Sequence, residues 1–279
     1  MEEPTVTWLC VNDASGSNDE QARQDVVEAL TAVGAKPQRV VDVLTDGFPQ
    51  LEELERAGAE LLVVFTGDGT ANSVVSGLEG WGGRILVLPG GTANLLCRSL
   101  HGECDAVAIV AKLPQMRPLR RPCIRTSQGI GLIEVLAGPG ATWSDVREEL
   151  REGNLPGVAT SSLTAIRQST TGPLVAVVLP PLGKAEGYSG VRLEAAADGM
   201  LVEGYGVETV ADYLKQGVAL LRRDFRQGPH EDLGVEREVV CRSLGGDPIE
   251  LMIDGERRTG ALEERFSLAE LAVDLLASN

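Results

Sequence analysis

Short apolar runs recur through the first hundred residues, and each has the length of a β-strand. They span Val6–Val11, Val40–Leu44, Leu61–Phe65 and Ile85–Leu88. The last two are apolar at every position, which is typical of strands buried on both faces of a parallel sheet.

Between these runs, apolar residues recur at the spacing of a helix. Asp19–Val33 has this pattern and is followed by Gly34, a common helix stop. The other predicted helices span Leu51–Ala57, Ala71–Leu78 and Asn94–Leu100. Strands that alternate with helices predict a doubly wound α/β domain whose loops gather at the carboxyl ends of the strands.

The pattern changes after Lys112, where Pro114, Pro118 and Pro122 indicate a linker. One charged helical stretch, Ser144–Arg151, follows among short β-like runs. These runs span Gly131–Ala137, Leu174–Leu179, Val191–Ala195, Val235–Cys241 and Ile249–Ile253. They predict a mainly antiparallel β domain, arranged as a β-sandwich.

We therefore expect an α/β domain over residues 1–116 and a β-rich domain over 117–263. Residues 264–279 are a candidate to return to the first domain. The pattern of Phe266–Leu276 fits a last strand or a last helix.

Composition and charge exclude several classes of protein. The net charge of −16 argues against nonspecific nucleic-acid binding. No run of eighteen apolar residues exists, so no transmembrane helix is predicted. The start, Met1-Glu2-Glu3-Pro4, lacks the apolar core of a signal peptide, so we expect a cytoplasmic protein.

Cysteine and histidine usage narrows the chemistry further. The cysteines are odd in number and lack paired spacing, which predicts reduced thiols; they are Cys10, Cys97, Cys104, Cys123 and Cys241. His101 and His230 are the only histidines, so a His-rich zinc site is excluded. We expect His101 at the surface or at a helix end.

Arginine clusters stand out against the acidic background. One contains Arg117, Arg120, Arg121 and Arg125, and the other contains Arg222, Arg223 and Arg226. Taken alone, each cluster fits a set of solvated loop or helix-end charges. The sharper interpretation is a basic rim that meets anionic headgroups.

The strongest chemical signal is a pair of glycine-rich turns. Thr66-Gly67-Asp68-Gly69-Thr70 follows one buried run, and Gly90-Gly91-Thr92-Ala93-Asn94 follows the next run and Pro89. A strand that ends in glycines and opens a helix gathers backbone N–H groups at a helix N-terminus. Two such turns predict a nucleotide-phosphate cradle on adjacent strands of one sheet.

Other phosphate motifs are absent from the sequence. The pattern G-x-x-x-x-G-K-[ST] does not occur, and Asn72 stands where a dinucleotide fingerprint has its third glycine. The charge of a triphosphate must then be met by backbone N–H groups, a metal ion or arginine. Arg98, four residues after Asn94, is the best-placed arginine.

Together these residues resemble diacylglycerol-kinase-like lipid kinases, a group that includes the sphingosine kinases. Four segments carry the resemblance, in the family's order: Asn12-Asp13-Ala14-Ser15-Gly16, Gly67-Asp68-Gly69-Thr70, Gly91-Thr92-Ala93-Asn94 with Arg98, and Asp254-Gly255-Glu256. The resemblance implies an α/β nucleotide domain, a C-terminal β-sandwich and an active site in the cleft between them. It also implies ATP, Mg²⁺ and a lipid hydroxyl acceptor.

The resemblance also implies roles for single residues. Asp68 would orient phosphate or metal, Asp254 would accept the proton of the lipid hydroxyl, and Glu256 would support Asp254. Nucleotide contacts would come from Asn12, Ser15, Thr66, Gly67, Gly69, Thr70, Asn72, Gly91, Thr92, Asn94 and Arg98.

Four positions depart from the family's pattern. Thr66 replaces a glycine, Ser73 a glutamate, Leu95 an aspartate and Asp13 a proline. Because two of these changes remove carboxylates, the metal ligands stay open.

Plainer interpretations compete with several of these roles. Asp and Gly are common turn residues, Asn12 and Ser15 fit turn caps, and Thr92 and Asn94 fit caps of the following helix. Asp254-Gly255 between β-like runs is a strong hairpin signal. A hairpin and a catalytic role are compatible, since a hairpin can present a carboxylate rigidly.

Two rival functions stay open. One is a kinase of a soluble acceptor, such as an NAD kinase, which shares the glycine turn. The other is a catalytically degenerate protein that binds lipid or nucleotide. For the lipid kinase we expect ATP and a lipid as partners, transient visits to a membrane surface, and no nucleic acid.

Overall fold

The computed structural model describes residues 5–12, 20–102, 105–139, 174–206 and 230–278. It divides into two compact units. Unit 1 contains Met1–Arg121 and Glu270–Asn279, and unit 2 contains Pro122–Ala269. The expected helix Ser144–Arg151 and the cluster around Arg222 lie outside the described residues.

Unit 1 is built on a six-stranded sheet. Its strands are β1 (Thr7–Val11), β2 (Pro37–Asp42), β3 (Leu61–Thr66), β4 (Arg84–Pro89), β5 (Arg117–Leu119) and β18 (Asp274–Ala277). Their order is β2-β1-β3-β4-β18-β5. The ladders from β2 to β18 are parallel, and β5 joins β18 in the antiparallel sense.

Helices connect these strands, and the sequence predicted the first four of them. They are α1 (Glu20–Ala32), α2 (Leu51–Arg56), α3 (Asp68–Gly77), α4 (Leu95–His101), α5 (Ala106–Ala111) and the short 3₁₀ helix η1 (Leu113–Gln115). The helix expected from Ala71 begins earlier, at Asp68, because Gly67 takes the extended N-cap conformation. The glycine turn is therefore the first turn of α3.

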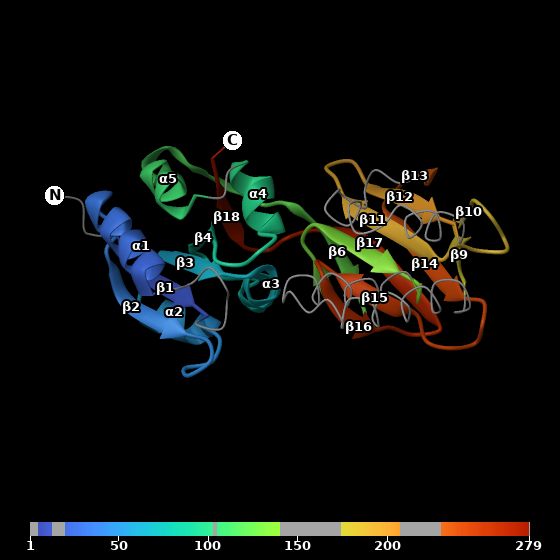
Figure 1. The fold of residues 1–279 in the computed structure, drawn as a ribbon, viewed down its shortest axis with the longest axis horizontal. Helices are drawn as coiled ribbons and strands as arrows, with labels where there is room; N and C mark the ends of the chain where they lie inside the picture. Colours follow the sequence, from blue (N-terminus) through green and yellow to red (C-terminus); the bar gives the residue numbers. More distant parts are fainter. Residues whose placement is uncertain (1–4, 13–19, 103–104, 140–173, 207–229, 279) are drawn as a thin grey trace, which may run out of the picture. The chain divides into compact units, whose positions relative to one another are not determined.

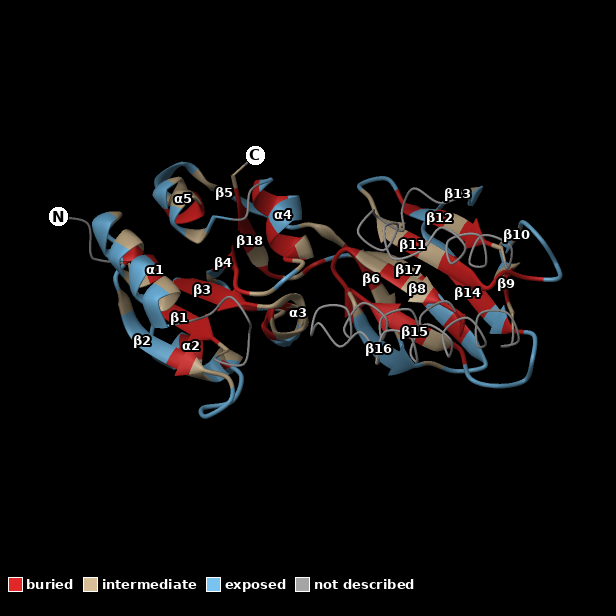
Figure 2. Ribbon diagram, viewed as in Figure 1, coloured by how far each residue is buried: buried red, intermediate tan, exposed pale blue. Residues whose placement is uncertain are grey.

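Burial along the strands follows their position in the sheet. Every residue of β3 is buried, as are Ile85–Pro89 of β4, whereas Gln38–Val40 of the edge strand β2 are exposed. Figure 2 shows this contrast between red β3 and β4 and pale blue β2. Apolar residues at every position of the central strands follow from packing on both faces.

The C-terminal segment forms strands rather than a helix, and its last strand lies in unit 1. β17 (Glu263–Glu270) belongs to a sheet of unit 2, and β18 pairs with β4 in unit 1. Figure 1 shows β18, dark red, beside β4, although nearly two hundred residues of chain separate them. The sheet of unit 1 is thus completed by the end of the chain.

Unit 2 is a sandwich of two six-stranded sheets. The first has the order β10-β9-β14-β17-β6-β7 and adds to β17 the strands β6 (Pro122–Thr126), β7 (Gly129–Gly131), β9 (Val175–Leu179), β10 (Pro181–Leu182) and β14 (Glu238–Ser243). The second has the order β13-β12-β11-β8-β15-β16. Its strands are β8 (Glu134–Ala137), β11 (Gly190–Ala195), β12 (Met200–Tyr205), β13 (Glu231–Glu236), β15 (Glu250–Ile253) and β16 (Glu256–Thr259).

Residues of both sheets form one core. Ile124 and Phe266 of the first sheet pack with Val135, Leu193 and Leu251 of the second. This arrangement confirms the predicted antiparallel sandwich and the fold class of an α/β domain followed by a β domain.

One predicted strand was wrong in its extent. Val235–Cys241 is an unbroken run in the sequence, but it contains the ends of two strands, β13 and β14, on either side of Arg237. β13 belongs to one sheet and β14 to the other. The chain changes sheets at Arg237, and a local pattern of strand-favouring residues does not report such a crossing.

Candidate active site

The first glycine turn joins β3 to α3. The first backbone bond of the helix runs from Ala71 N to Gly67 O at 2.9 Å. The N–H groups of Asp68, Gly69 and Thr70 therefore lie ahead of the helical ladder, at the positive end of the helix dipole. Thr66, the last residue of β3, is buried, and its hydroxyl donates to Gly67 O at 3.2 Å.

The second turn, after β4, is held by Asn94. Its backbone is left-handed, with φ 51° and ψ 44°. Its side chain closes the turn on Gly91 with two bonds: Gly91 N donates to Oδ1 at 2.8 Å, and Nδ2 donates to Gly91 O at 2.8 Å. Asn94 is thus the N-cap of α4 by position, but its side chain bonds backward to Gly91.

The two turns touch through their main chains. Gly90 N donates to Thr66 O at 3.1 Å. A Cβ on Gly90 would lie 2.6 Å from Thr66 N, and one on Gly91 would lie 2.6 Å from Gly67 Cα. Glycine is required at both positions because the backbones approach this closely.

Two side chains, one after β1 and one after β3, add to this contact. Asn12, after β1, donates from Nδ2 to Thr70 Oγ1 at 2.9 Å. Asp68 Oδ1 accepts a bond from Leu96 N at 3.3 Å, which joins the start of α3 to the first turn of α4. The carboxyl ends of β1, β3 and β4 thus meet at one place, as expected of ligand sites in open α/β sheets.

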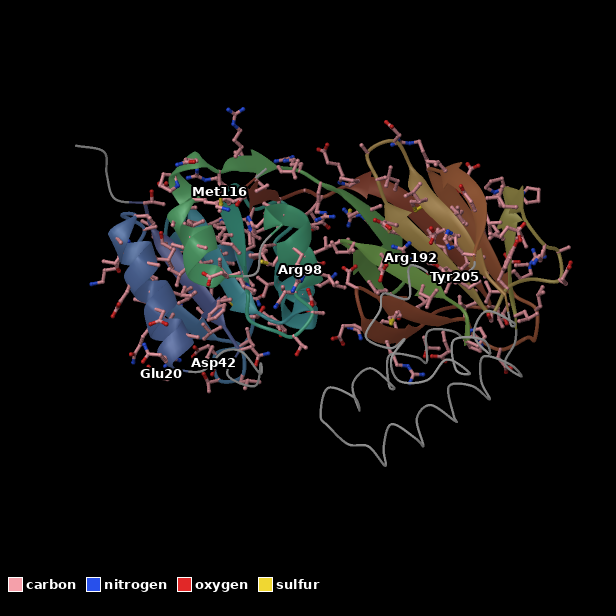
Figure 3. The ribbon with its side chains drawn as sticks, turned by 45° about the horizontal axis from the view of Figure 1, so that its top comes forward. Glu20, Asp42, Arg98, Met116, Arg192 and Tyr205 are labelled. Carbon is pink, nitrogen blue, oxygen red and sulfur yellow. The ribbon has the colours of Figure 1, made fainter. Side chains whose placement is uncertain are left out.

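The remaining predicted contacts lie around the same edge. Arg98 is exposed on α4 and donates from Nε to Ala93 O at 3.1 Å, and Figure 3 labels it. Thr92 is exposed in the second turn, and Asn72 Oδ1 accepts a bond from Ser76 Oγ at 3.3 Å. Ser15 lies outside the described residues.

The turns and strands of unit 1 match a known family. The model of the diacylglycerol kinase catalytic domain matches residues 7–120. This stretch of unit 1 is therefore similar to the diacylglycerol kinase catalytic domain. The resemblance seen in the sequence is therefore confirmed.

Solved structures extend the likeness in fold to nearly the whole chain. A diacylglycerol kinase from Bacillus anthracis str. Sterne aligns with a TM-score of 0.67 at 15% identity, over 98% of this chain and 96% of that chain. Two more structures from that organism, provisionally described as diacylglycerol kinases, align with TM-scores of 0.63 and 0.65 at 14% identity. They cover 98% and 97% of this chain and 96% of their own chains. No curated protein matches the sequence.

In unit 2, the segment Asp254-Gly255-Glu256 forms a hairpin turn. β15 and β16 pair in the antiparallel sense around Asp254 and Gly255. Both residues have positive φ, 48° and 94°, as the turns favoured in two-residue hairpins require. The hairpin predicted from Asp-Gly is confirmed.

Asp254 is fixed by the main chain of the loop before β8. Its side chain is buried, and its carboxylate accepts three backbone bonds: from Leu132 N at 2.6 Å, Ile133 N at 2.8 Å and Glu134 N at 2.9 Å. Both oxygens take part. This contact was missed by the sequence analysis because the donors are backbone amides that lie about 120 residues earlier.

Glu256 begins β16 and is exposed. The D-G-E segment therefore presents two carboxylates in different states. Asp254 is held inside the sandwich, and Glu256 faces solvent.

A charged cluster on the second sheet of unit 2 was missed by the sequence analysis. Arg192 Nε and Nη1 bond Glu134 and Glu203 at 2.8 Å each, and Nη2 bonds Glu194. Tyr205 donates to Glu203 at 2.9 Å; Figure 3 labels Arg192 and Tyr205. Cross-strand pairing brings these residues together, and only the strand register reveals it.

The cluster explains three pKa changes. Burial disfavours the charge of Arg192, but Glu134, Glu203 and Glu194 outweigh it and raise its pKa. Burial opposes ionisation of Glu203, but bonds from Arg192 and Tyr205 lower its pKa below the usual value. Burial, with Glu203 next to the ring, raises the pKa of Tyr205. We interpret the cluster as a structural element that stabilises the pairing of β8, β11 and β12.

His101 lies at a helix end, which is one of its two expected places. It is the last residue of α4, but it is buried rather than at the surface, and its Nδ1 lies 2.8 Å from Ser278 Oγ. Burial lowers its pKa to about 4, partly opposed by the Val87 carbonyl and assisted by Lys112. The return of the C-terminal strand buries this residue.

No group of three His, Cys, Asp or Glu side chains in the described part of the chain is arranged to hold a metal ion. None of the described helices is long and apolar enough to cross a membrane.

Proposed function

We propose that this protein is an ATP-dependent kinase that phosphorylates a hydroxyl of a lipid, such as diacylglycerol. One observation carries the proposal. Two glycine turns of a diacylglycerol kinase catalytic domain contact each other through backbone at the ends of β3 and β4. Such a turn pair presents main-chain N–H groups and a helix N-terminus to phosphate.

On the nucleotide side, backbone does most of the binding. The N–H groups of Asp68, Gly69 and Thr70 stand ahead of the α3 ladder, and Asn12 ties Thr70 to the end of β1. Arg98 is the exposed cation on α4. Phosphoryl transfer depends on positioning and charge stabilisation, which rigid backbone donors supply.

The residues present fit Mg²⁺ bound mainly by the nucleotide. Mg²⁺ in kinase sites is held by one or two carboxylates together with substrate phosphates and water. Asp68 is the carboxylate in the first turn and would be its protein ligand. When bound, the ion would offset the negative charge of the phosphates.

On the acceptor side, we assign different tasks to Asp254 and Glu256. Both carboxylate oxygens of Asp254 accept bonds from backbone amides, three in all. Because these bonds hold the side chain in place, we assign to Asp254 the positioning of the hairpin. Glu256 is the exposed carboxylate of the same turn, and we assign proton acceptance to it. This assignment exchanges the two roles implied by the family resemblance.

The proposal includes the cellular localisation of the enzyme. The four described cysteines are buried free thiols, which suits a reducing compartment, so we propose a cytoplasmic enzyme. A lipid acceptor requires visits to a membrane surface.

The deciding experiment uses γ-labelled ATP with a panel of lipids in mixed micelles, and NAD as a soluble control acceptor. The proposal expects label on a lipid and none on NAD. If only NAD is labelled, the proposal of a lipid acceptor is wrong and the acceptor is soluble.

A pair of variants tests the acceptor side. Glu256→Gln should lower the transfer rate by about two to four orders of magnitude, the usual worth of a positioned proton acceptor. Asp247→Asn, an exposed carboxylate on the loop between β14 and β15, is the matched control and should keep full activity. ATP affinity should be unchanged in both, and a fully active Glu256→Gln variant would refute the assignment.

The rival function is a binder without transferase activity, and one observation favours it. Ser73 and Leu95 stand where the family has carboxylates, and Ser73 Oγ is bonded to Gly69 O at 2.9 Å. ATP binding by calorimetry, with no transfer to any lipid in the panel, would establish this function instead.

A further inference from the structure

We propose that the segment from the end of α5 through β5 docks unit 1 on an anionic lipid surface. We call it the β5 edge and define it by Lys112, Met116, Arg117, Leu119, Arg120 and Arg121. Met116, labelled in Figure 3, directly precedes β5. The inference needs neither ATP nor a lipid acceptor, so it stands independently of the proposed kinase activity.

The first support is the sign of the charge. The chain carries a net charge of −16, yet no Asp or Glu occurs between Ala106 and Ile133. The basic residues of that stretch that lie in unit 1 are Lys112, Arg117, Arg120 and Arg121. Such a strip on an acidic protein is attracted to an anionic surface, so it favours an approach through this edge.

The second support is exposure. β5 is the outermost strand of its sheet, and all three of its residues, Arg117, Pro118 and Leu119, are exposed. Leu119 keeps 45% of its surface in solvent. An exposed apolar side chain between arginines suits the boundary of headgroups and acyl chains, where apolar and cationic groups both gain.

Carboxylates near the β5 edge reduce its charge without cancelling it. Arg120 Nε bonds Asp274 Oδ1 on β18 at 2.9 Å, and Glu270 lies close enough to act on the same guanidinium. The Arg120 side chain still exposes 51% of its surface. Arg121 donates to the hydroxyl of Ser99 at 2.7 Å.

The lipid surface is a better occupant than a nucleic acid. A nucleic acid would make favourable contacts with the arginines alone. A lipid surface would also bind the apolar side chains of Leu119 and Met116. The partner we propose is therefore a bilayer that contains anionic phospholipid.

The test is flotation of the full chain with phosphatidylcholine vesicles, with and without phosphatidylglycerol, at low and high salt. The wild type should float only with the phosphatidylglycerol vesicles and only at low salt. Arg117→Gln should lower the partition coefficient about five-fold, and Arg117→Glu should lower it further. Leu119→Ser should weaken binding in a way that salt does not change.

Arg258→Glu is the matched control, since Arg258 is an exposed arginine on β16, the edge strand of a unit 2 sheet. It should float as the wild type does. Equal losses in Arg117→Glu and Arg258→Glu would overturn the inference, as would equal flotation with both vesicle types or binding to duplex DNA in place of vesicles. Circular dichroism shows whether each variant is folded. If Arg117→Glu does not fold, the flotation of Arg117→Gln tests the inference in its place.

Discussion

Gly91 and Gly67 contact each other so closely that a Cβ on Gly91 would lie 2.6 Å from Gly67 Cα. A side chain at Gly91 therefore collides first with the protein's own main chain. The structure indicates that it would also push the two turns apart.

Gly91→Ala should reduce stability and ATP affinity together. Overpacking of this kind costs about 1–3 kcal/mol of unfolding free energy. Denaturant unfolding and calorimetry with ATP measure the two effects. Gly77→Ala is the control, because a Cβ on Gly77 meets nothing within 4 Å and helix propensity favours alanine. A destabilised Gly77→Ala variant, or a Gly91→Ala variant with normal ATP affinity, would contradict this account.

Asn94 should be more tolerant of glycine than of alanine. Its φ of 51° is costly for alanine by about 1–2 kcal/mol and nearly free for glycine. Both variants lose the bonds to Gly91, worth about 1 kcal/mol each. Denaturant unfolding should therefore rank wild type above Asn94→Gly and Asn94→Gly above Asn94→Ala. The reverse order of the two variants would show that strain does not matter here.

Asp254→Asn should destabilise unit 2. An amide side chain has one acceptor oxygen, so at least one of the three amides that bond Asp254 now would lose its partner inside the protein. An unsatisfied buried donor costs about 1–3 kcal/mol. Thermal unfolding of Asp254→Asn and of the exposed Asp247→Asn gives the comparison. Equal stability of the two variants would mean that the three bonds contribute nothing.

His101 should make the protein less stable in mild acid. Its pKa is lowered to about 4 in the folded state, against an ordinary value of 6.5 for histidine. The unfolded state therefore binds more protons between these values, so stability is full above pH 6.5 and falls as the pH drops toward 4. The loss approaches about 3 kcal/mol.

Denaturant titrations at several pH values measure this loss. His101→Gln should flatten the pH dependence, whereas His230→Gln, which replaces the only other histidine, should keep it. If His101→Gln retains the full slope between pH 6.5 and 4, other groups are responsible for the loss.

Local sequence was enough to predict β1 to β4, α1 to α4 and the two glycine turns. The apolar runs that form β3 and β4 predict central strands of a sheet, because strands with no polar side chain must be buried on both faces. Gly67 and Gly90 follow those strands directly, and glycines at a strand end before a helix predict a phosphate-binding turn. The Asp254-Gly255 hairpin was also predictable, since two adjacent positive φ angles favour this pair.

Only the tertiary structure decided which distant residues meet. Asp254 bonds amides of Leu132, Ile133 and Glu134, and the amides of a loop carry no mark in the sequence. His101 is buried because β18 returns beside β4. The sequence determined what each segment prefers to form, because propensity and periodicity act over a few residues. Long-range pairing fixed the partners, because burial and hydrogen bonding depend on what the rest of the chain brings to the same place.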